Sequence, residues 1–261
     1  MTKPVKSDGT VGKALEILDM VAGIGRPVRF TELLRQSPHP KATLYRFLQT
    51  LTNQGMLSYD PVSQNYSLGV RLVRLAHAAW KQASLAPVAR PYIDALALET
   101  GETIHLAQMD KGQVLYVDKR NAAAPLEMFS SAGKVGPGYC TGVGKAIMAF
   151  MEPEAQTRAI SQQSWYRYTE NTLSGAEALA AELGQIRADG VCFDREEHEP
   201  GIICIAAPIL SAGDRVIGAL SITSATNRHS LEGLLAFKVA LLATAENIGT
   251  EAANWQFPTQ H

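Results

Sequence analysis

Residues 40–69, PKATLYRFLQTLTNQGMLSYDPVSQNYSLG, predict a helix that runs directly into a β-hairpin. In the helix, apolar residues recur at the spacing i, i+3, i+4, i+7, which marks one buried face; they are Leu44, Phe47, Leu48 and Leu51. Gly55 suits the left-handed position that ends such a helix. Two short strands, residues 56–59 and 65–68, then flank a turn at residues 60–63, where Pro61 is preset for the second turn position.

Two further helices are predicted before this stretch. VGKALEILDMVA, residues 11–22, places Val11, Leu15, Leu18 and Val21 on one helical face. TELLRQ, residues 31–36, predicts a short helix that Thr31 caps. Three helices followed by a hairpin are the elements of a winged helix-turn-helix, in which the third helix enters the major groove of DNA.

The polar face of the third predicted helix has the chemistry of a nucleic-acid contact. It carries Lys41, Thr43, Tyr45, Arg46 and Gln49, which can reach phosphates and base edges. For a single helix, a solvated polar face is the alternative interpretation. The hairpin that follows the helix favours DNA.

Charge is distributed unevenly along the 261 residues. The net charge is −1, yet residues 1–84 carry 11 lysines and arginines against 5 acidic residues. Residues 85–261 carry 13 basic and 20 acidic residues. A basic front and an acidic body indicate that only the front binds a polyanion.

Composition sets the class of protein. A hydrophobic content of 46% and a charged content of 19% are typical of a soluble chain, and the length favours two domains. The polar start MTKPVKSDGT and the lack of a long apolar run predict a cytoplasmic protein with no membrane partner. Three cysteines without a CxxC spacing predict no disulfide framework and no zinc site, and we expect no cofactor.

The rest of the chain predicts a linking helix and a second, larger domain. The domain boundaries that we predict are 8–69 for the winged helix-turn-helix, 70–85 for the linker helix and 86–252 for the body. The body has the order α-β-β-β-α-α-β-β-β-α, with its third strand at residues 124–131 and one long closing helix at 230–252. This order predicts an α+β domain with a single antiparallel sheet. A two-fold DNA site would require two such chains, joined through the linker helix.

The loop PGYCTGVGKA, residues 137–146, looks like a nucleotide-binding phosphate loop. A true phosphate loop needs a glycine where Tyr139 stands and a serine or threonine where Ala146 stands. We therefore exclude a nucleotide and interpret Lys145 as a structural or rim charge.

The whole chain resembles transcriptional regulators of the IclR type. The stretches that carry the resemblance, in the family's order, are GKALEILDMV, PKATLYRFLQTL, DPVSQNYSLG, TGETIHLAQ, CTGVGKA, FDREEHEPGIICIAAPI and GALSIT. The resemblance implies a winged helix head, a linker helix and a GAF/PAS-like effector domain. It also implies a dimer or tetramer that represses or activates genes for small-molecule catabolism.

The resemblance implies site residues in both domains. To the polar face of the third helix it adds Lys13, where the family usually has arginine, and we include Gln64 of the wing as a DNA-binding residue. Ala42 and the pair Gly138-Tyr139 also depart from the usual Ser and Leu-His. The effector-binding positions it implies are Leu126, Met128, Phe129, Gly142, Val143, Asp194, Cys204, Ser221 and Thr223.

The chemistry of these positions agrees with a small anionic ligand. Ser221 and Thr223 stand two apart on a predicted strand and so point to one face. Glycines at a helix start give a carboxylate access to free N–H groups. We expect a small carboxylate such as glyoxylate or pyruvate, or a sugar acid, as effector.

The alternative class is a small-molecule enzyme with a helix-turn-helix used only for assembly. Cys140 or Cys204 with His198 could form a thiol hydrolase pair, but no third orienting group is evident. Residues 197–199, EHE, are consecutive, which suits one metal ion poorly and favours a charged rim. His105 is interpreted as a packed histidine. We predict a ligand-controlled DNA-binding regulator with no catalytic and no metal-binding residues.

Overall fold

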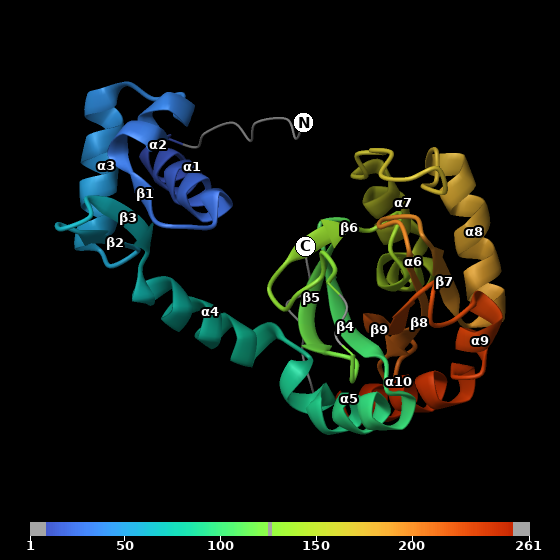
Figure 1. Ribbon diagram of the computed structural model, residues 1–261. Coiled ribbons are helices and arrows are strands. Elements are labelled where there is room, and N and C mark those ends of the chain that lie inside the picture. The colour runs from blue at the N-terminus through green and yellow to red at the C-terminus, as the bar shows by residue number, and fades with distance from the viewer. Residues whose placement is uncertain (1–8, 125–126, 253–261) are drawn as a thin grey trace. The chain divides into compact units, whose positions relative to one another are not determined.

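The computed structural model describes residues 9–124 and 127–252 (Figure 1). The chain separates into two compact units, which divide between Gln82 and Ala83. Within the described ranges, no helix is long and apolar enough to cross a membrane.

The N-terminal unit is a winged helix-turn-helix followed by a helix. Its elements are α1 (Gly9–Ile24), β1 (Val28–Arg29), α2 (Phe30–Gln36), α3 (Lys41–Asn53), β2 (Leu57–Asp60), β3 (Asn65–Leu68) and α4 (Val70–Ala83). The three strands form an antiparallel sheet in the order β1-β3-β2.

Helix α3 and the wing follow the sequence pattern. The four apolar residues of the predicted stripe are all buried, and Gly55 has a φ of +70° just beyond the helix, which a residue with a Cβ seldom adopts. In the wing turn, the Asp60 carboxylate accepts from the Val62 N–H at 2.9 Å and the Ser63 hydroxyl at 2.6 Å. These bonds fix the loop between β2 and β3.

Helices α1 and α2 differ from the prediction. In α1 the buried residues are Ile17, Leu18 and Val21, whereas Val11 and Leu15 are exposed because only the C-terminal half of the helix lies against the core. Helix α2 begins at Phe30, and no side chain caps it, so Thr31 is inside the helix rather than at its cap.

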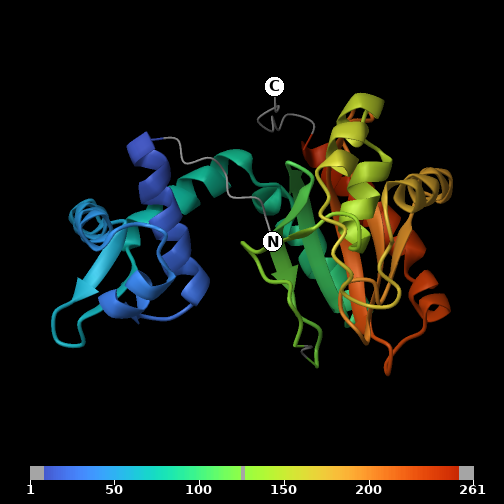
Figure 2. The same ribbon diagram turned by 90° about the horizontal axis from the view of Figure 1, so that it is seen from above.

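The C-terminal unit is a six-stranded antiparallel sheet between two layers of helices. In chain order its elements are α5 (Ala86–Thr100), β4 (Thr103–Asp110), β5 (Gln113–Arg120), β6 (Val135–Pro137), α6 (Gly142–Ala149), α7 (Pro153–Ser161), α8 (Ala176–Asp189), β7 (Cys192–Arg195), β8 (Ile202–Leu210), β9 (Val216–Ala225), α9 (Leu231–Leu235) and α10 (Lys238–Glu251). The strand order is β6-β5-β4-β9-β8-β7. Helices α5 and α10 cover one face, and α6 covers the other with α7 and α8 outside it (Figure 2).

Two predictions for this unit are wrong. Of the predicted strand at 124–131, the described residues are not in a strand, and the edge strand is β6, three residues that include a glycine and a proline. A proline is tolerated at such an edge because it has no ladder N–H to lose. The predicted closing helix is broken into α9 and α10 at Ala236 and Phe237.

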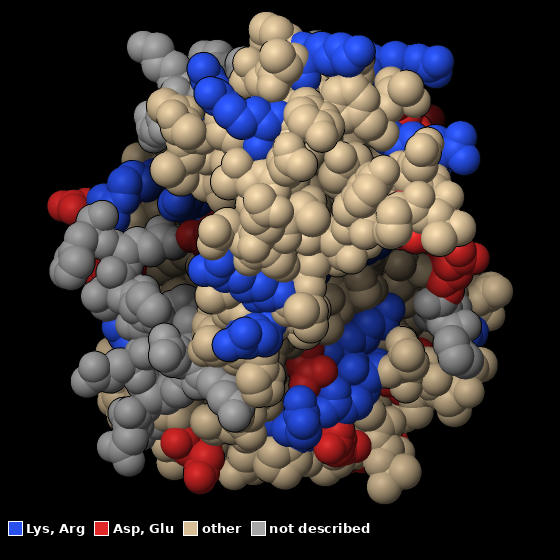
Figure 3. Space-filling model, turned by 90° about the vertical axis from the view of Figure 1, so that its left-hand side faces the viewer, with Lys and Arg blue, Asp and Glu red and all other residues tan. Residues whose placement is uncertain are grey.

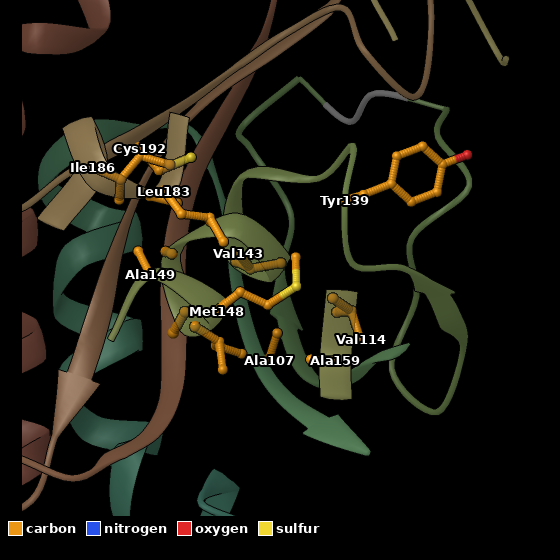
Figure 4. Packing of buried hydrophobic residues seen from close by; sticks show 14 of the residues in the cluster. Ala107, Val114, Tyr139, Val143, Met148, Ala149, Ala159, Leu183, Ile186 and Cys192 are labelled. Carbon is orange, nitrogen blue, oxygen red and sulfur yellow. The ribbon is translucent and has the colours of Figure 1, made fainter. Parts of the chain in front are cut away.

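A core cluster holds α6 against the sheet. Figure 4 shows Val143 and Met148 of α6 in its middle, with Leu183 of α8 on one side and Val114 of β5 on the other. All eight residues of α6 are buried, the charged Lys145 among them. The sheet and this core therefore fix the position of the N-terminus of α6.

Candidate functional site

The predicted DNA-binding residues lie on the outer face of α3, on α1 and on the wing. Lys41, Tyr45, Arg46 and Gln49 are exposed, while Thr43 is half-buried. Lys13 is exposed on α1, and Gln64 is exposed in the wing with a φ of 57°. Figure 3 shows the molecule from the left-hand side of Figure 1. On this face, lysine and arginine side chains are spread over the surface between uncharged ones.

A groove lies between α3 and the wing, and aromatic rings line it. The rings of Phe30 and Tyr45 meet edge to face at 6.1 Å between centroids, and those of Tyr59 and Tyr66 lie 4.8 Å apart. Arg29, Lys41 and Gln64 add polar groups to its lining. Arg29 and Tyr59 are not among the predicted DNA-binding residues; the pairing of β1 and β2 with β3 brings them to this groove.

The C-terminal unit contains a small cavity between the sheet and the N-terminus of α6. Seven predicted effector positions line it: Met128, Gly142, Val143, Asp194, Cys204, Ser221 and Thr223. Seven other residues complete the lining: His105, Tyr116, Ser130, Thr141, His198, Glu199 and Ile202. Its free space is about 30 Å³, room for one or two water molecules.

The remaining predicted positions lie elsewhere. Phe129 is not part of the lining; its ring packs against His198 at 5.2 Å between centroids, and it is 39% exposed. Leu126 lies outside the described residues. Tyr139, which departs from the family's usual residue, is fully buried, and its hydroxyl donates to the Tyr166 carbonyl. Tyr139 therefore fills the core and does not narrow the cavity.

The N-terminus of α6 is open toward the cavity. Thr141 precedes the helix but does not cap it, because its hydroxyl donates to the Pro137 carbonyl at 2.7 Å. The first N–H groups of a helix have no partner within the helix. A Cβ on Gly142 would come 2.4 Å from the Cys204 sulfur and 3.7 Å from the Asp194 Cβ. Glycine at this position lets the helix start approach β7 and β8.

His105 connects three parts of the cavity wall. Its Nδ1 lies 3.1 Å from the Thr223 hydroxyl and 3.3 Å from the Ser221 hydroxyl, and its Nε2 lies 2.7 Å from the Ser130 hydroxyl. Burial, and next the charge of Lys119, lowers the pKa of His105 to about 3, so the ring is neutral. The prediction took His105 for a packed histidine; it is buried, and it also lines the cavity and orients two of the predicted hydroxyls.

Behind the cavity, Lys145 ties α6 to α8 and to the loop after β7. Its amine is fully buried and donates to Glu182 at 2.7 Å, to the Phe193 carbonyl at 2.9 Å and to Glu197. Lys145 is thus a structural charge. Glu197 is 2% exposed, which corrects the prediction of a charged rim at this residue.

The cysteines are poorly suited to act as the nucleophile of a thiol hydrolase. All three cysteines are buried and free, and burial raises the pKa of Cys192 to about 12 and also that of Cys140 and Cys204. These thiols are therefore protonated near neutral pH and are poor nucleophiles. In the part of the chain that the structure describes, no group of three His, Cys, Asp or Glu side chains is placed to hold a metal ion.

A winged helix-turn-helix joined to a domain with a small cavity, lined by polar and apolar side chains, defines the class of ligand-responsive DNA-binding regulators. Comparison with known proteins gives the same class. Residues 10–61 match the IclR helix-turn-helix domain, and residues 77–250 match the family described as bacterial transcriptional regulator IclR C-terminal. The chain belongs to the IclR family of transcriptional regulators.

Individual relatives cover nearly the whole chain. The HTH-type transcriptional regulator KdgR of Escherichia coli (strain K12) is 31% identical over 255 residues, which are 97% of each chain. The crystal structure of the Thermotoga maritima IclR, 26% identical, covers 94% of this chain and 98% of its own at a TM-score of 0.76. An IclR homolog from Microbacterium hydrocarbonoxydans complexed with 4-hydroxybenzoate, 21% identical, has the same fold at a TM-score of 0.80 and covers 93% of this chain and 98% of its own. These relatives are regulators and give no support to the alternative of an enzyme.

Proposed function

We propose that this chain controls transcription as a homodimer or homotetramer bound to a palindromic operator. A small carboxylate bound in the cavity either weakens or strengthens the binding to DNA. The observation that carries the proposal is the cavity itself. It brings the uncapped start of α6 together with hydroxyls from three other segments of the chain.

The DNA contact is assigned to the exposed face of α3, with Arg46 at its centre. Lys13, Lys41, Thr43, Tyr45, Gln49 and Gln64 complete the proposed set. Basic side chains would bind phosphates, and Arg46 and Gln49, which are three residues apart on α3, would reach base edges.

The effector is assigned to the carboxylate class from the cavity's donors. N–H groups at the start of α6 favour an anion, and the Ser221 and Thr223 hydroxyls can each donate a hydrogen bond to it. Met128, Val143 and Ile202 give an apolar wall. Because the free space is about 30 Å³, a two- or three-carbon acid already needs lining side chains to move, and larger sugar acids need more movement.

The cavity and the DNA-binding face of α3 are coupled if the effector changes the spacing between the two winged helix-turn-helix units of a dimer on a two-fold operator. Such coupling is a free energy shared by the two binding events. It requires only that the acid binds one arrangement of the dimer more tightly than the other.

The test is fluorescence anisotropy on the DNA upstream of the chain's own gene, with and without glyoxylate, pyruvate and gluconate. We expect specific binding that weakens as salt rises, because counterions are released from phosphates. Arg46→Ala should weaken the complex about 10- to 100-fold, and the control Arg158→Ala, which removes the same charge from an exposed position on α7, should leave it unchanged. Binding that is indifferent to salt and sequence would contradict the proposed DNA contact.

The effector assignment has its own readout. Thermal shift of the full chain should respond to at least one of the acids, and Ser221→Ala should reduce that response while DNA binding persists. An unchanged response in Ser221→Ala would contradict the proposed site.

A further inference from the structure

Asp194 is a buried carboxyl group in the wall of a cavity that is otherwise suited to an anion. It lies at the end of β7, opposite Cys204 of β8, and is 8% exposed. Its Oδ1 accepts from the Glu197 N–H at 2.8 Å. The residue lines the cavity beside the start of α6.

Among the described residues, the lining of the cavity holds no lysine or arginine that could neutralise both Asp194 and an anionic ligand. The nearest buried cation, Lys145, is already shared by two carboxylates, Glu182 and Glu197. His105, on β4, is neutral. The ionisable groups that face Asp194 come from every element around it: Tyr116 on β5, Cys140 and Lys145 at α6, Cys192 on β7, Cys204 on β8, and Glu197, His198 and Glu199 in the loop after β7.

We propose that the effector is bound together with one proton from solvent, and that Asp194 holds this proton as a neutral carboxylic acid whose O–H faces the ligand. This inference rests on the proposed carboxylate effector and adds the protonation state in which the site accepts it. A charged Asp194 would repel an anion bound beside it, whereas the neutral acid provides a further hydrogen-bond donor.

The environment of Asp194 agrees with this role. Burial, and next the charge of Glu197, raises the pKa of Asp194 to about 7 in the free protein. The group is therefore half ionised near neutral pH, and an anion beside it would raise its pKa further, so that the group stays protonated in the complex. The carboxyl groups of glyoxylate, pyruvate and gluconate stay ionised above pH 6, so the ligand itself takes up no proton.

The experiment is isothermal titration calorimetry of the full chain with glyoxylate, pyruvate and gluconate in pairs of buffers that differ in ionisation enthalpy. For a group with a pKa of about 7, the acid that binds should take up about 0.9 proton at pH 8 and about 0.1 at pH 6. Its Kd should rise about eightfold from pH 7.5 to pH 8.5 and should level off below pH 6.5.

Variants locate the proton. Asp194→Asn should bind with less than about 0.2 proton taken up at pH 8 and with a Kd that no longer depends on pH. Asp214→Asn, at an exposed residue in the turn between β8 and β9, is the matched control and should keep the wild-type proton uptake. Because Asn keeps the shape of Asp, a folded Asp194→Asn chain is expected, and its thermal unfolding verifies this.

Each other result overturns the inference in a distinguishable way. Binding without proton uptake would contradict it and leave the carboxylate effector standing. Uptake that survives Asp194→Asn but disappears in His198→Gln would place the proton on His198 instead. If none of the three acids binds, the carboxylate effector fails, and the inference fails with it.

Discussion

Lys145→Met should destabilise the C-terminal unit strongly, because it removes a buried cation and keeps the length of the side chain. The wild-type amine is 0% exposed and has two carboxylate partners, one of which, Glu197, is itself 3% exposed in its side chain. Methionine leaves the Glu197 charge buried without a partner. Breaking a buried ion pair in this way typically costs about 3–5 kcal/mol.

The loss should depend on pH. Burial already raises the pKa of Glu197, and removal of Lys145 raises it further, so the carboxyl group can escape the penalty by taking up a proton. A folded-state pKa above the unfolded value means that stability is present at low pH and is lost as pH rises. The difference in unfolding free energy between wild type and Lys145→Met should therefore be larger at pH 8 than at pH 5.5.

Urea unfolding at the two pH values, followed by circular dichroism, measures this difference. Lys145→Met combined with Glu197→Gln should recover part of the loss, since the buried charge is gone, and the control Lys111→Met, at an exposed turn residue, should change stability by less than about 0.5 kcal/mol. A loss below about 1 kcal/mol that does not vary with pH would refute the view that Lys145 balances buried carboxylates.

Three further predictions concern single residues. The native pKa of Asp194 is about 7, above the unfolded value of about 3.9, so wild type should lose about 3 kcal/mol relative to Asp194→Asn between pH 4 and pH 7; parallel stability curves from urea unfolding would contradict this. Gly142→Ala places a Cβ 2.4 Å from the Cys204 sulfur, so it should abolish the thermal shift by the effector while DNA binding persists, and adding Cys204→Ala should restore part of the shift; a full response in the single variant would show that the start of α6 does not bind the ligand. Arg46→Ala should weaken operator binding about 10- to 100-fold without changing effector affinity, and an unchanged anisotropy titration would exclude Arg46 from the DNA contact.

Much of the N-terminal unit could be predicted because local patterns determine it. The leucine stripe of α3, the glycine after it and the Asp-Pro turn of the wing each act within a few residues. The face of α1 could not be predicted in the same way. Val11 and Leu15 continue the apolar stripe past the edge of the core, and a hydrophobic pattern does not show where the partner surface ends.

Part of the cavity lining could be predicted from the sequence. The rest depends on contacts between residues that are far apart in the chain. Gly142, Asp194, Cys204 and the two hydroxyls of β9 lie in the stretches that carry the resemblance to the IclR family. His105 is a single histidine on a strand, and its partners Ser221 and Thr223 lie 116 and 118 residues away. Only the pairing of β4 with β9, which sets His105 opposite Ser221, brings them together.

In the function that we propose, binding of an acid in the cavity and binding of DNA to α3 are coupled, so that each changes the affinity for the other. The most direct measurement is the affinity of the chain for its upstream DNA at saturating effector, together with the affinity for the effector at saturating DNA. We predict that each ligand changes the affinity for the other by the same factor, at least about fivefold, because linkage is reciprocal. Two affinities that are independent of each other would contradict the account, even if both ligands bind.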